Sequence, residues 1–345
     1  ECDPEILTMQ ISSFKNCIDV CGRFMNENEL NDLSTKVLTL LADSEKRNIE
    51  TSKFNDFDDD DEDESNHHPD HGDFNNDEED LHLALAELFG VLFKTHKELT
   101  LPLARVLYTQ VIAKALSPSN SDKMLKFGLL ICVDMIDYLG YELVADIWPQ
   151  LSEALLAFVT HKTAYLRQLA SFGIGLLAQR GKVAFKSMSE VCINKILEAL
   201  KIQKGAETER SYIFSVDNLV AALGKILEAH PDLTNANELA KVWFSKLPIR
   251  LDESEGPVQH ELLVDILLTG DASVVLGKNG EGIGHLLKVF VHIANSRMSN
   301  EKVNTKISKV LKLLAEGPTQ EIVAKELNGF TELQKQRIKA LLLSQ

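Results

Sequence analysis

The sequence predicts an all-α protein made of about seven antiparallel helix pairs stacked into a superhelical solenoid. Apolar residues recur along most of the 345-residue chain at the i, i+3, i+4, i+7 spacing of amphipathic helices. The helices that open each pair start at nearly regular intervals, and no segment shows the alternating pattern of a strand. These observations together favour a helical repeat protein over a compact mixed fold.

The helical pattern is clearest in six segments. In the segment 164–181, for example, Leu166, Ala170 and Leu177 fall on one face. Short polar links at 117–121 and 160–163 join neighbouring helices. The six predicted helices cover residues 27–52, 81–99, 123–140, 141–159, 164–181 and 213–230.

The first helices of successive pairs begin at a nearly constant spacing. Steps of 40, 43, 51 and 46 residues separate the starts near Leu101, Tyr141, Ala184, Asn235 and Glu281. The longest step contains a polar insert at 201–211. Two helices per roughly 40–47 residues is the HEAT or armadillo range, and such units bury their apolar faces only by stacking.

Two details favour HEAT repeats. Pro149 falls inside the pattern of a first helix and should kink it, while Pro102 starts another first helix. Arg167 lies near the start of a second helix, where HEAT repeats often place Arg, but the Asp usual in the preceding turn is replaced by the sequence THKT. We therefore expect residues 1–345 to form one HEAT array, which opens without Met and is expected to be a piece of a larger protein.

An acidic insertion interrupts this array. The chain has 36 basic and 52 acidic side chains, a net charge of −16, and 14 of the acids lie in the window 56–80, which has no Lys or Arg. We assign 53–80 as an insertion between the helices of one repeat and expect it to lack ordered structure. Its central block is Asp58, Asp59, Asp60, Asp61, Glu62, Asp63 and Glu64.

The sequence shows no catalytic, cofactor or metal signature. The Gly-rich segment 277–284 lacks the closing Gly-Lys-Ser/Thr of a phosphate loop and is expected to be a loop before a helix. The segment HHPDH at 67–71 is better explained as a solvated tract than as a metal site. Nucleic-acid binding is disfavoured because no basic surface is concentrated. The chain shows no signal peptide or apolar stretch of about 20 residues, so we expect no membrane insertion.

The five cysteines form a sparse, odd-numbered set, which favours free thiols in a reducing compartment over a disulfide framework. Cys132 and Cys192 lie within apolar helical patterns. Cys17 and Cys21 share one helix face without a further ligand nearby. We expect buried thiols.

Several stretches in the same order resemble the C-terminal third of an importin-β superfamily nuclear transport receptor, with the third importin-β subfamily in its fungal form as the nearest branch. They are YLRQLASFGIGLLAQRG (165–181), SVDNLVAALGKILEAHPD (215–232), VWFSKLPI (242–249) and VVLGKNGEGI (274–283). The position of the acidic insertion adds to the likeness, which runs over essentially the whole chain.

The resemblance implies a carrier that shuttles between cytoplasm and nucleus, without a cofactor and as a monomer. It implies binding to basic cargo with Lys-rich nuclear localisation signals and to Phe-Gly nucleoporins. Ran-GTP would release cargo, mainly through the N-terminal part of the receptor, which this chain lacks, so the chain alone should bind Ran weakly or not at all.

Two surfaces follow from this resemblance. Second helices line the concave face of a HEAT solenoid, and their polar residues would meet cargo, although each could equally be an ordinary solvated helix charge. The cargo candidates are Asp134, Asp137, Asp217, Asn218 and Glu228. First helices cover the convex face, where aromatic side chains either bind nucleoporins or pack between repeats. The nucleoporin candidates are Trp148, Phe158, Trp243 and Phe244.

Two questions stay open at the level of sequence. A HEAT scaffold or adaptor, such as a phosphatase regulatory, coat or chromosome-associated subunit, has the same composition and period. The block Asp58–Glu64 could attract basic cargo, compete with the receptor for the Lys-rich signal and speed release, or only increase solubility.

Overall fold

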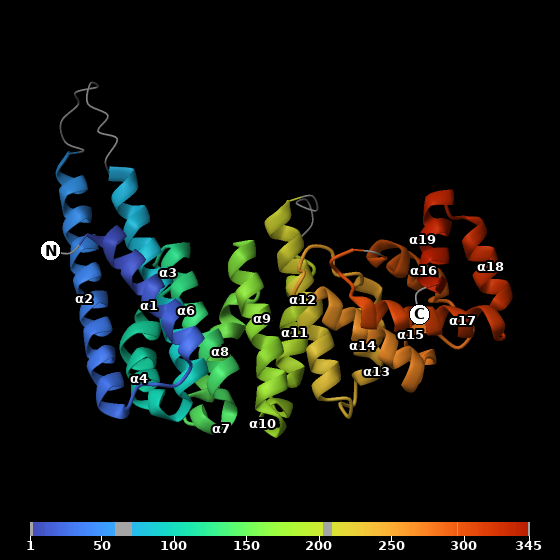
Figure 1. Ribbon diagram of the computed structural model, residues 1–345, viewed down its shortest axis with the longest axis horizontal. Coiled ribbons are helices and arrows are strands. Elements are labelled where there is room, and N and C mark those ends of the chain that lie inside the picture. The colour runs from blue at the N-terminus through green and yellow to red at the C-terminus, as the bar shows by residue number, and fades with distance from the viewer. Residues whose placement is uncertain (1–2, 59–70, 203–208, 295, 344–345) are drawn as a thin grey trace. The chain divides into compact units, whose positions relative to one another are not determined.

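The computed structural model of the chain is helical throughout the residues it describes, which are 3–58, 71–202, 209–294 and 296–343 (Figure 1). Side chains are described from residue 77 onward in the second of these ranges and up to residue 47 in the first. The described residues contain no strand, which confirms the all-α prediction. The chain divides into two compact units, residues 1–154 and 155–345.

The first unit contains three long helices followed by shorter segments. In chain order they are α1 (Pro4–Cys21), α2 (Glu27–Asp58), α3 (His71–His96), the 3-10 turn η1 (Lys97–Thr100), α4 (Leu101–Val106), the π-helix η2 (Leu107–Ile112), α5 (Ala113–Ala115), α6 (Asp122–Asp134), the π-helix η3 (Met135–Leu139), α7 (Gly140–Val144) and α8 (Trp148–Phe158), which crosses the boundary between the units.

The second unit continues the same alternation. Its helices are α9 (Ala164–Gly181), α10 (Val183–Lys186), α11 (Ser189–Ala199), α12 (Arg210–Ala229), α13 (Ala236–Lys246), α14 (Gly256–Thr269), α15 (Ser273–Leu276), α16 (Ile283–Ile293), α17 (Glu301–Glu316), α18 (Gln320–Asn328) and α19 (Glu332–Leu343).

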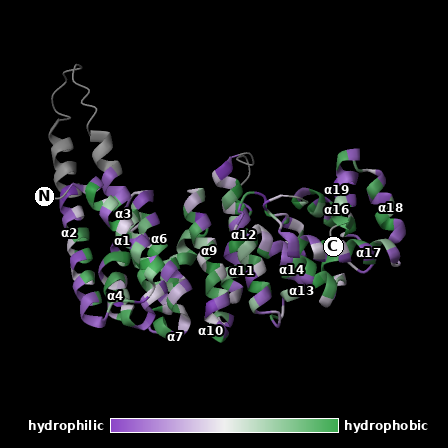
Figure 2. Ribbon diagram, viewed as in Figure 1, coloured by the Kyte–Doolittle hydropathy of each residue, from purple (hydrophilic) through white to green (hydrophobic). Residues whose placement is uncertain are grey.

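Within each unit the helices form two layers. Second helices contact one another, α1 with α3 and α3 with α6 in the first unit, and α9 with α12, α14 with α17 and α17 with α19 in the second. First helices form the other layer, in which α13 contacts α15 and α16 contacts α18. Most helices carry both hydrophobic and hydrophilic residues (Figure 2), as expected when one face of each helix is buried between layers. This arrangement confirms the HEAT-type fold class.

The helix starts agree with the predicted period. The first helices begin at Leu101, Gly140, Val183, Ala236 and Ile283, each within two residues of the predicted start. Residues 277–282 form a loop before α16, as predicted, and residues 283 and 284 begin the helix. Gly277 and Gly280 adopt left-handed φ values of 77° and 76° in this loop. Side chains with a Cβ would be strained at both positions.

Pro149 does not kink a continuous helix. The predicted helix 141–159 is two helices, since α7 ends at Val144 and α8 begins at Trp148. Pro149 is therefore in the first turn of α8, where its missing N–H leaves no intrahelical hydrogen bond unmade. Pro102 lies in the first turn of α4, as predicted.

The helices flanking the acidic insertion extend farther than predicted. α2 continues to Asp58 and α3 begins at His71, so the segment between them is 59–70 rather than 53–80. The block Asp59–Glu64 lies outside the described residues. The structure therefore leaves the predicted lack of order in this block untested.

A buried polar cluster joins the two flanking helices below the insertion. Ser44 on α2 donates a hydrogen bond to Glu78 on α3 and lies 3.0 Å from His82 Nε2. Arg47 pairs with the same Glu78 carboxylate through two nitrogens. Ser44, Glu78 and His82 are buried, so the cluster fixes the register of α2 against α3.

Of the four described cysteines, two are buried and two are exposed. Cys132 and Cys192 are buried as predicted, and burial raises the pKa of each thiol to about 12. Cys17 and Cys21 are exposed, so the prediction of buried thiols is wrong for them. α1 turns Leu7, Ile11 and Ile18 inward, and the two thiols lie off that apolar stripe.

Two further features concern membranes and metals. Among the described helices, none has the length and apolar content needed to cross a bilayer. Within the same residues, no three His, Cys, Asp or Glu side chains are grouped as metal ligands would be.

Candidate functional surfaces

The predicted cargo residues of the first unit lie where α3 and α6 approach closely. Asp134 ends α6 and Asp137 lies in η3, and both side chains are half-buried. Asp134 packs against Gly90 of α3, where a Cβ atom would come within 2.3 Å of the carboxylate oxygen. Glycine at position 90 therefore allows the carboxyl group to lie between the two helices.

The surroundings of Asp134 disfavour its charged form. Burial, together with the smaller effects of the neighbouring carboxylates of Asp137 and Glu87, raises the pKa of its carboxyl group to about 7. The carboxyl group is therefore partly protonated near neutral pH. A cation brought to this point would stabilise the carboxylate and lower its pKa.

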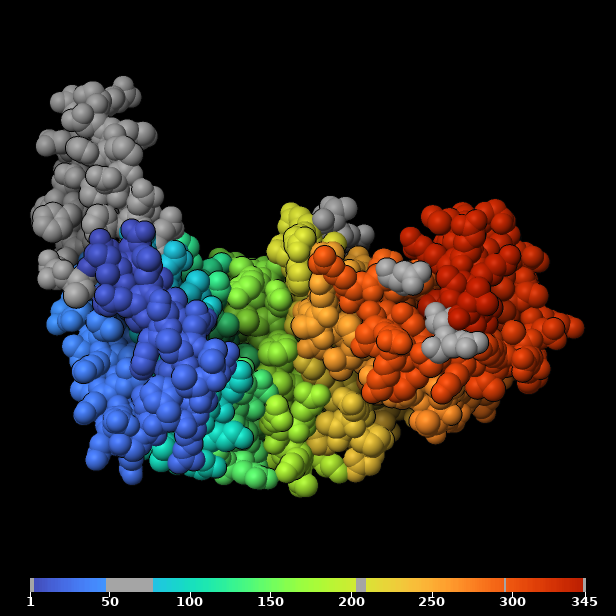
Figure 3. Space-filling model, in the orientation of Figure 1, coloured from blue at the N-terminus to red at the C-terminus, as the bar shows by residue number. Residues whose placement is uncertain are grey.

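Two more carboxylates lie on the adjoining helices. Lys15 on α1 pairs with Glu87 on α3 at 2.6 Å, and Lys94 on α3 pairs with Asp19 on α1 at 2.7 Å. α1, dark blue in the space-filling view, lies at the surface of the first unit (Figure 3). We name Asp19, Glu87, Asp134 and Asp137 the acidic face.

The predicted cargo residue Asp217 has a different role. Its side chain is 2% exposed and accepts backbone N–H groups from Arg250, Leu251 and Asp252 at 2.7 to 3.1 Å. These three residues belong to the linker between α13 and α14. The prediction that Asp217 faces cargo is corrected, because its carboxylate is buried and binds this linker.

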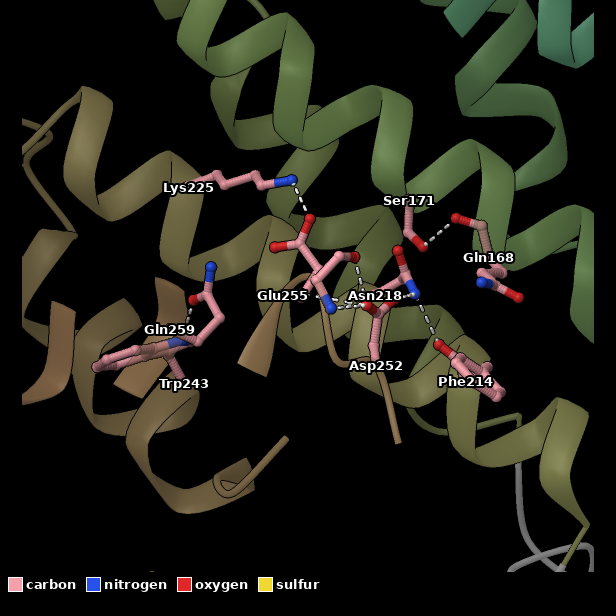
Figure 4. Close-up of polar contacts among 10 residues, drawn as sticks. Gln168, Ser171, Phe214, Asn218, Lys225, Trp243, Asp252, Glu255 and Gln259 are labelled. Atoms are coloured by element: carbon pink, nitrogen blue, oxygen red, sulfur yellow. Dashed lines mark hydrogen bonds and ion pairs between the residues drawn. The ribbon is translucent and has the colours of Figure 1, made fainter. Parts of the chain in front are cut away.

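Asn218 extends the same contact. Its amide donates to Asp252 Oδ2 at 2.8 Å and to the carbonyl oxygen of Phe214 at 3.0 Å (Figure 4). Asp252 in turn accepts the backbone N–H of Ser254 and of Glu255 just before α14. Asn218 is 2% exposed, so its predicted contact with cargo is corrected in the same way.

A buried ion pair and an amide contact complete this region. Lys225 on α12 pairs with Glu255, and both side chains are at most 7% exposed (Figure 4). The Lys225 ammonium also lies 4.3 Å from the centre of the Phe172 ring. Trp243 Nε1 donates to Gln259 Oε1 at 3.1 Å. We name Asp217, Asn218, Lys225, Asp252 and Glu255 the linker clamp.

The four predicted nucleoporin residues are core residues. Trp148, Phe158, Trp243 and Phe244 are between 0% and 7% exposed. Trp148 packs edge-on against Tyr141, and Phe244 against His285. The prediction that these residues bind nucleoporins is therefore corrected, because packing between helices covers their side chains. Glu228, the remaining cargo candidate, is exposed on α12.

Sequence reasoning missed the apolar residues that first helices do expose. Val183 on α10 is 79% exposed and Val191 on α11 is 53% exposed. Neither stands out in the sequence, because isolated valines fit a buried and an exposed helix position equally well.

Arg167 has a structural role in the turn that its position suggested. Its guanidinium donates to the carbonyl oxygens of His161 and Lys162 at 2.6 and 2.8 Å. The side chain is buried and closes the turn between α8 and α9. These carbonyl oxygens supply acceptors for Arg167 in a turn that lacks the usual Asp.

Comparison with known proteins connects this architecture to transport receptors. Residues 6–117 match the family described as importin repeat 6. This stretch, about a third of the chain, is similar to an importin repeat. The predicted resemblance to the importin-β superfamily is thereby confirmed.

Solved structures share the fold over nearly the whole chain. The crystal structure of Kap121p is 22% identical, with a TM-score of 0.70, and the match covers 99% of this chain and 28% of that one. Kap121p bound to Nup53p gives 22% identity, a TM-score of 0.70 and coverage of 99% and 29%. Kap121p bound to Pho4p is 21% identical, with a TM-score of 0.68, and the match covers 98% of this chain and 28% of that one. The chain thus spans less than a third of the length of these proteins.

Proposed function

We propose that this chain is a segment of a nuclear import receptor of the third importin-β subfamily, which carries basic cargo through nuclear pores. The observation that carries the proposal is the importin repeat at 6–117 within a two-layer HEAT array. The scaffold alternative has no comparable support, because neither the repeat family nor the matched structures belong to that class.

The acidic face is the proposed contact for basic cargo. Asp134 lies beside the carboxylates of Asp137 and Glu87, which raise the pKa of its carboxyl group. A cargo ammonium near Asp134 and Asp137 would relieve the repulsion that raises the pKa of the Asp134 carboxyl group. Charge-assisted hydrogen bonds to lysine would then form at a partly dehydrated site. Glu228 is a further, separate candidate.

The proposed nucleoporin contacts are Val183 and Val191, in place of the four buried aromatic residues. Phe-Gly repeats need exposed apolar surface on first helices, and these two side chains supply it on α10 and α11.

The remaining parts of the proposal concern the whole receptor. Ran-GTP would release the cargo mainly through repeats outside this chain, and the receptor would shuttle as a monomer between cytoplasm and nucleus. The block Asp58–Glu64 is proposed to act as a polyanion beside the cargo surface.

A Phe-Gly repeat resin separates a carrier from a scaffold. The native chain should be retained, and Val183→Ser with Val191→Ser should reduce retention severalfold. The matched control is Val20→Ser, which removes a valine that is 87% exposed on α1. Lack of retention of the native chain would favour the scaffold, and equal loss in the control would remove the two valines from the proposal.

A further inference from the structure

A pocket of about 330 Å³ opens in the second unit between the start of α12 and the end of α13. The proposed transport function does not use it. Its lining combines two cations with apolar and hydroxyl-bearing side chains, among them Tyr212, Val216, Ser245, Lys246, Pro248 and Arg250.

Hydrogen bonds to the backbone hold the linker that forms one wall of the pocket. Asp217 holds the backbone of the linker at Arg250, and His260 Nε2 accepts the N–H of Ile249 at 3.2 Å. His260 Nδ1 lies 2.7 Å from the carbonyl oxygen of Met298, so it carries the proton and the ring is held in one tautomer. The Arg250 side chain is exposed while its backbone is bonded, so the pocket wall is preorganised for a ligand.

The charge of the pocket is positive. Lys246 and Arg250 are exposed, and no carboxylate among the described side chains forms an ion pair with either. Asp217 lines the pocket, but its carboxylate accepts the linker N–H groups. The pKa of nearby His292 is lowered by burial and then by Arg250 and Arg337, as expected beside two cations.

We infer that this pocket binds an acidic peptide segment of a partner protein, with carboxylates on Lys246 and Arg250 and an apolar side chain against Val216 and Pro248. The volume suits one or two side chains. Single-stranded nucleic acid is disfavoured, because its binding uses a series of aromatic platforms and Tyr212 is the one aromatic residue in the pocket lining.

The test is fluorescence anisotropy with the full chain at low salt. The probe is a labelled 12-residue peptide of Asp and Glu with one central Leu. Lys246→Ala with Arg250→Ala should weaken binding about tenfold, since two partly exposed ion pairs are lost. Arg250→Ala keeps the backbone N–H that Asp217 binds, so an unchanged melting temperature shows that the variant is folded.

The matched control is Lys309→Ala with Lys312→Ala, which removes two exposed lysines of α17. It should change the affinity less than about twofold. The inference is overturned by no binding of the peptide to the native chain, by equal losses in the two double variants, or by an unchanged affinity of the pocket variant. It is also overturned if a 12-residue oligo-dT binds the pocket more tightly than the peptide does.

Discussion

The two units are built from the same helix pairs but carry opposite charge. Residues 1–154 have 12 basic and 32 acidic side chains, a net charge of −20, whereas residues 155–345 have 24 and 20, a net charge of +4. Outside the window 56–80 the first unit still holds 18 acids against 12 bases. The acidity of the first unit therefore extends beyond the insertion.

The units also differ in what surrounds their half-buried and buried acids. In the second unit Asp217 accepts three backbone N–H groups and Glu255 pairs with Lys225. In the first unit every cause acting on Asp134 raises its pKa. Burial raises the pKa of both Asp217 and Asp134, but the linker N–H groups oppose this shift at Asp217, whereas neighbouring carboxylates add to it at Asp134. Asp134 is therefore the carboxyl group that is poised to bind a cation from outside.

The largest expected effect comes from breaking the buried ion pair of the linker clamp. Lys225→Met leaves Glu255 buried without its cation, so the free energy of unfolding should fall by about 3–5 kcal/mol in urea denaturation. Lys288→Met, at an exposed position on α16, should change it by less than about 0.5 kcal/mol. Adding Glu255→Gln to Lys225→Met should restore part of the loss. A small effect of Lys225→Met alone would mean that the clamp does not hold the second unit.

A smaller effect is expected at Asp217. Asp217→Asn replaces one carboxylate oxygen with an NH₂ donor that faces the linker N–H groups, so we expect a loss of about 2–3 kcal/mol. Thermal unfolding measures it. Asp232→Asn, which removes an exposed partner of Lys186, should leave the melting temperature nearly unchanged. Equal effects of the two changes would return Asp217 to the surface role predicted from the sequence.

Neutralising Asp134 should have the opposite effect and stabilise the fold. A folded-state pKa of about 7, above the ordinary 3.8, means that the folded state loses stability as pH rises from about 4 to above 7. Asp134→Asn should therefore stabilise the chain by roughly 1–2 kcal/mol at pH 8 and by little at pH 4. Melting temperatures at the two pH values measure this. Exposed Asp32→Asn should show no such trend, and destabilisation by Asp134→Asn at pH 8 would contradict this account.

The helices and their period could be predicted from the sequence because amphipathic spacing is a local property. α9 was predicted at its observed bounds, and first-helix starts agreed within two residues. The roles of Asp217 and Asn218 could not be predicted, because their partners lie more than 30 residues away in a linker without a periodic pattern. The same limit applies to Trp243, since one sequence pattern fits both an exposed aromatic residue and a buried one.

The candidate site was predictable only in part. Asp134 and Asp137 lie on a second helix, as the period indicated, but their close approach to Glu87 depends on how α3 packs against α6 around Gly90. The extension of α2 to Asp58 was missed because its last turns are polar, and polar residues reveal little about helix length.

Binding of a Lys-rich nuclear-localisation peptide, followed by anisotropy at pH 7.5 and low salt, tests most directly whether the acidic face receives basic cargo. The account predicts that Asp134→Asn with Asp137→Asn weakens binding about tenfold, through the loss of two partly dehydrated charge contacts. It also predicts weaker binding to the native chain at pH 6, where Asp134 is protonated. Glu316→Gln with Glu321→Gln, two exposed acids of the second unit, should have less than about a twofold effect. Equal losses in the two double variants, or an unchanged affinity when the acidic face is neutralised, would contradict the account.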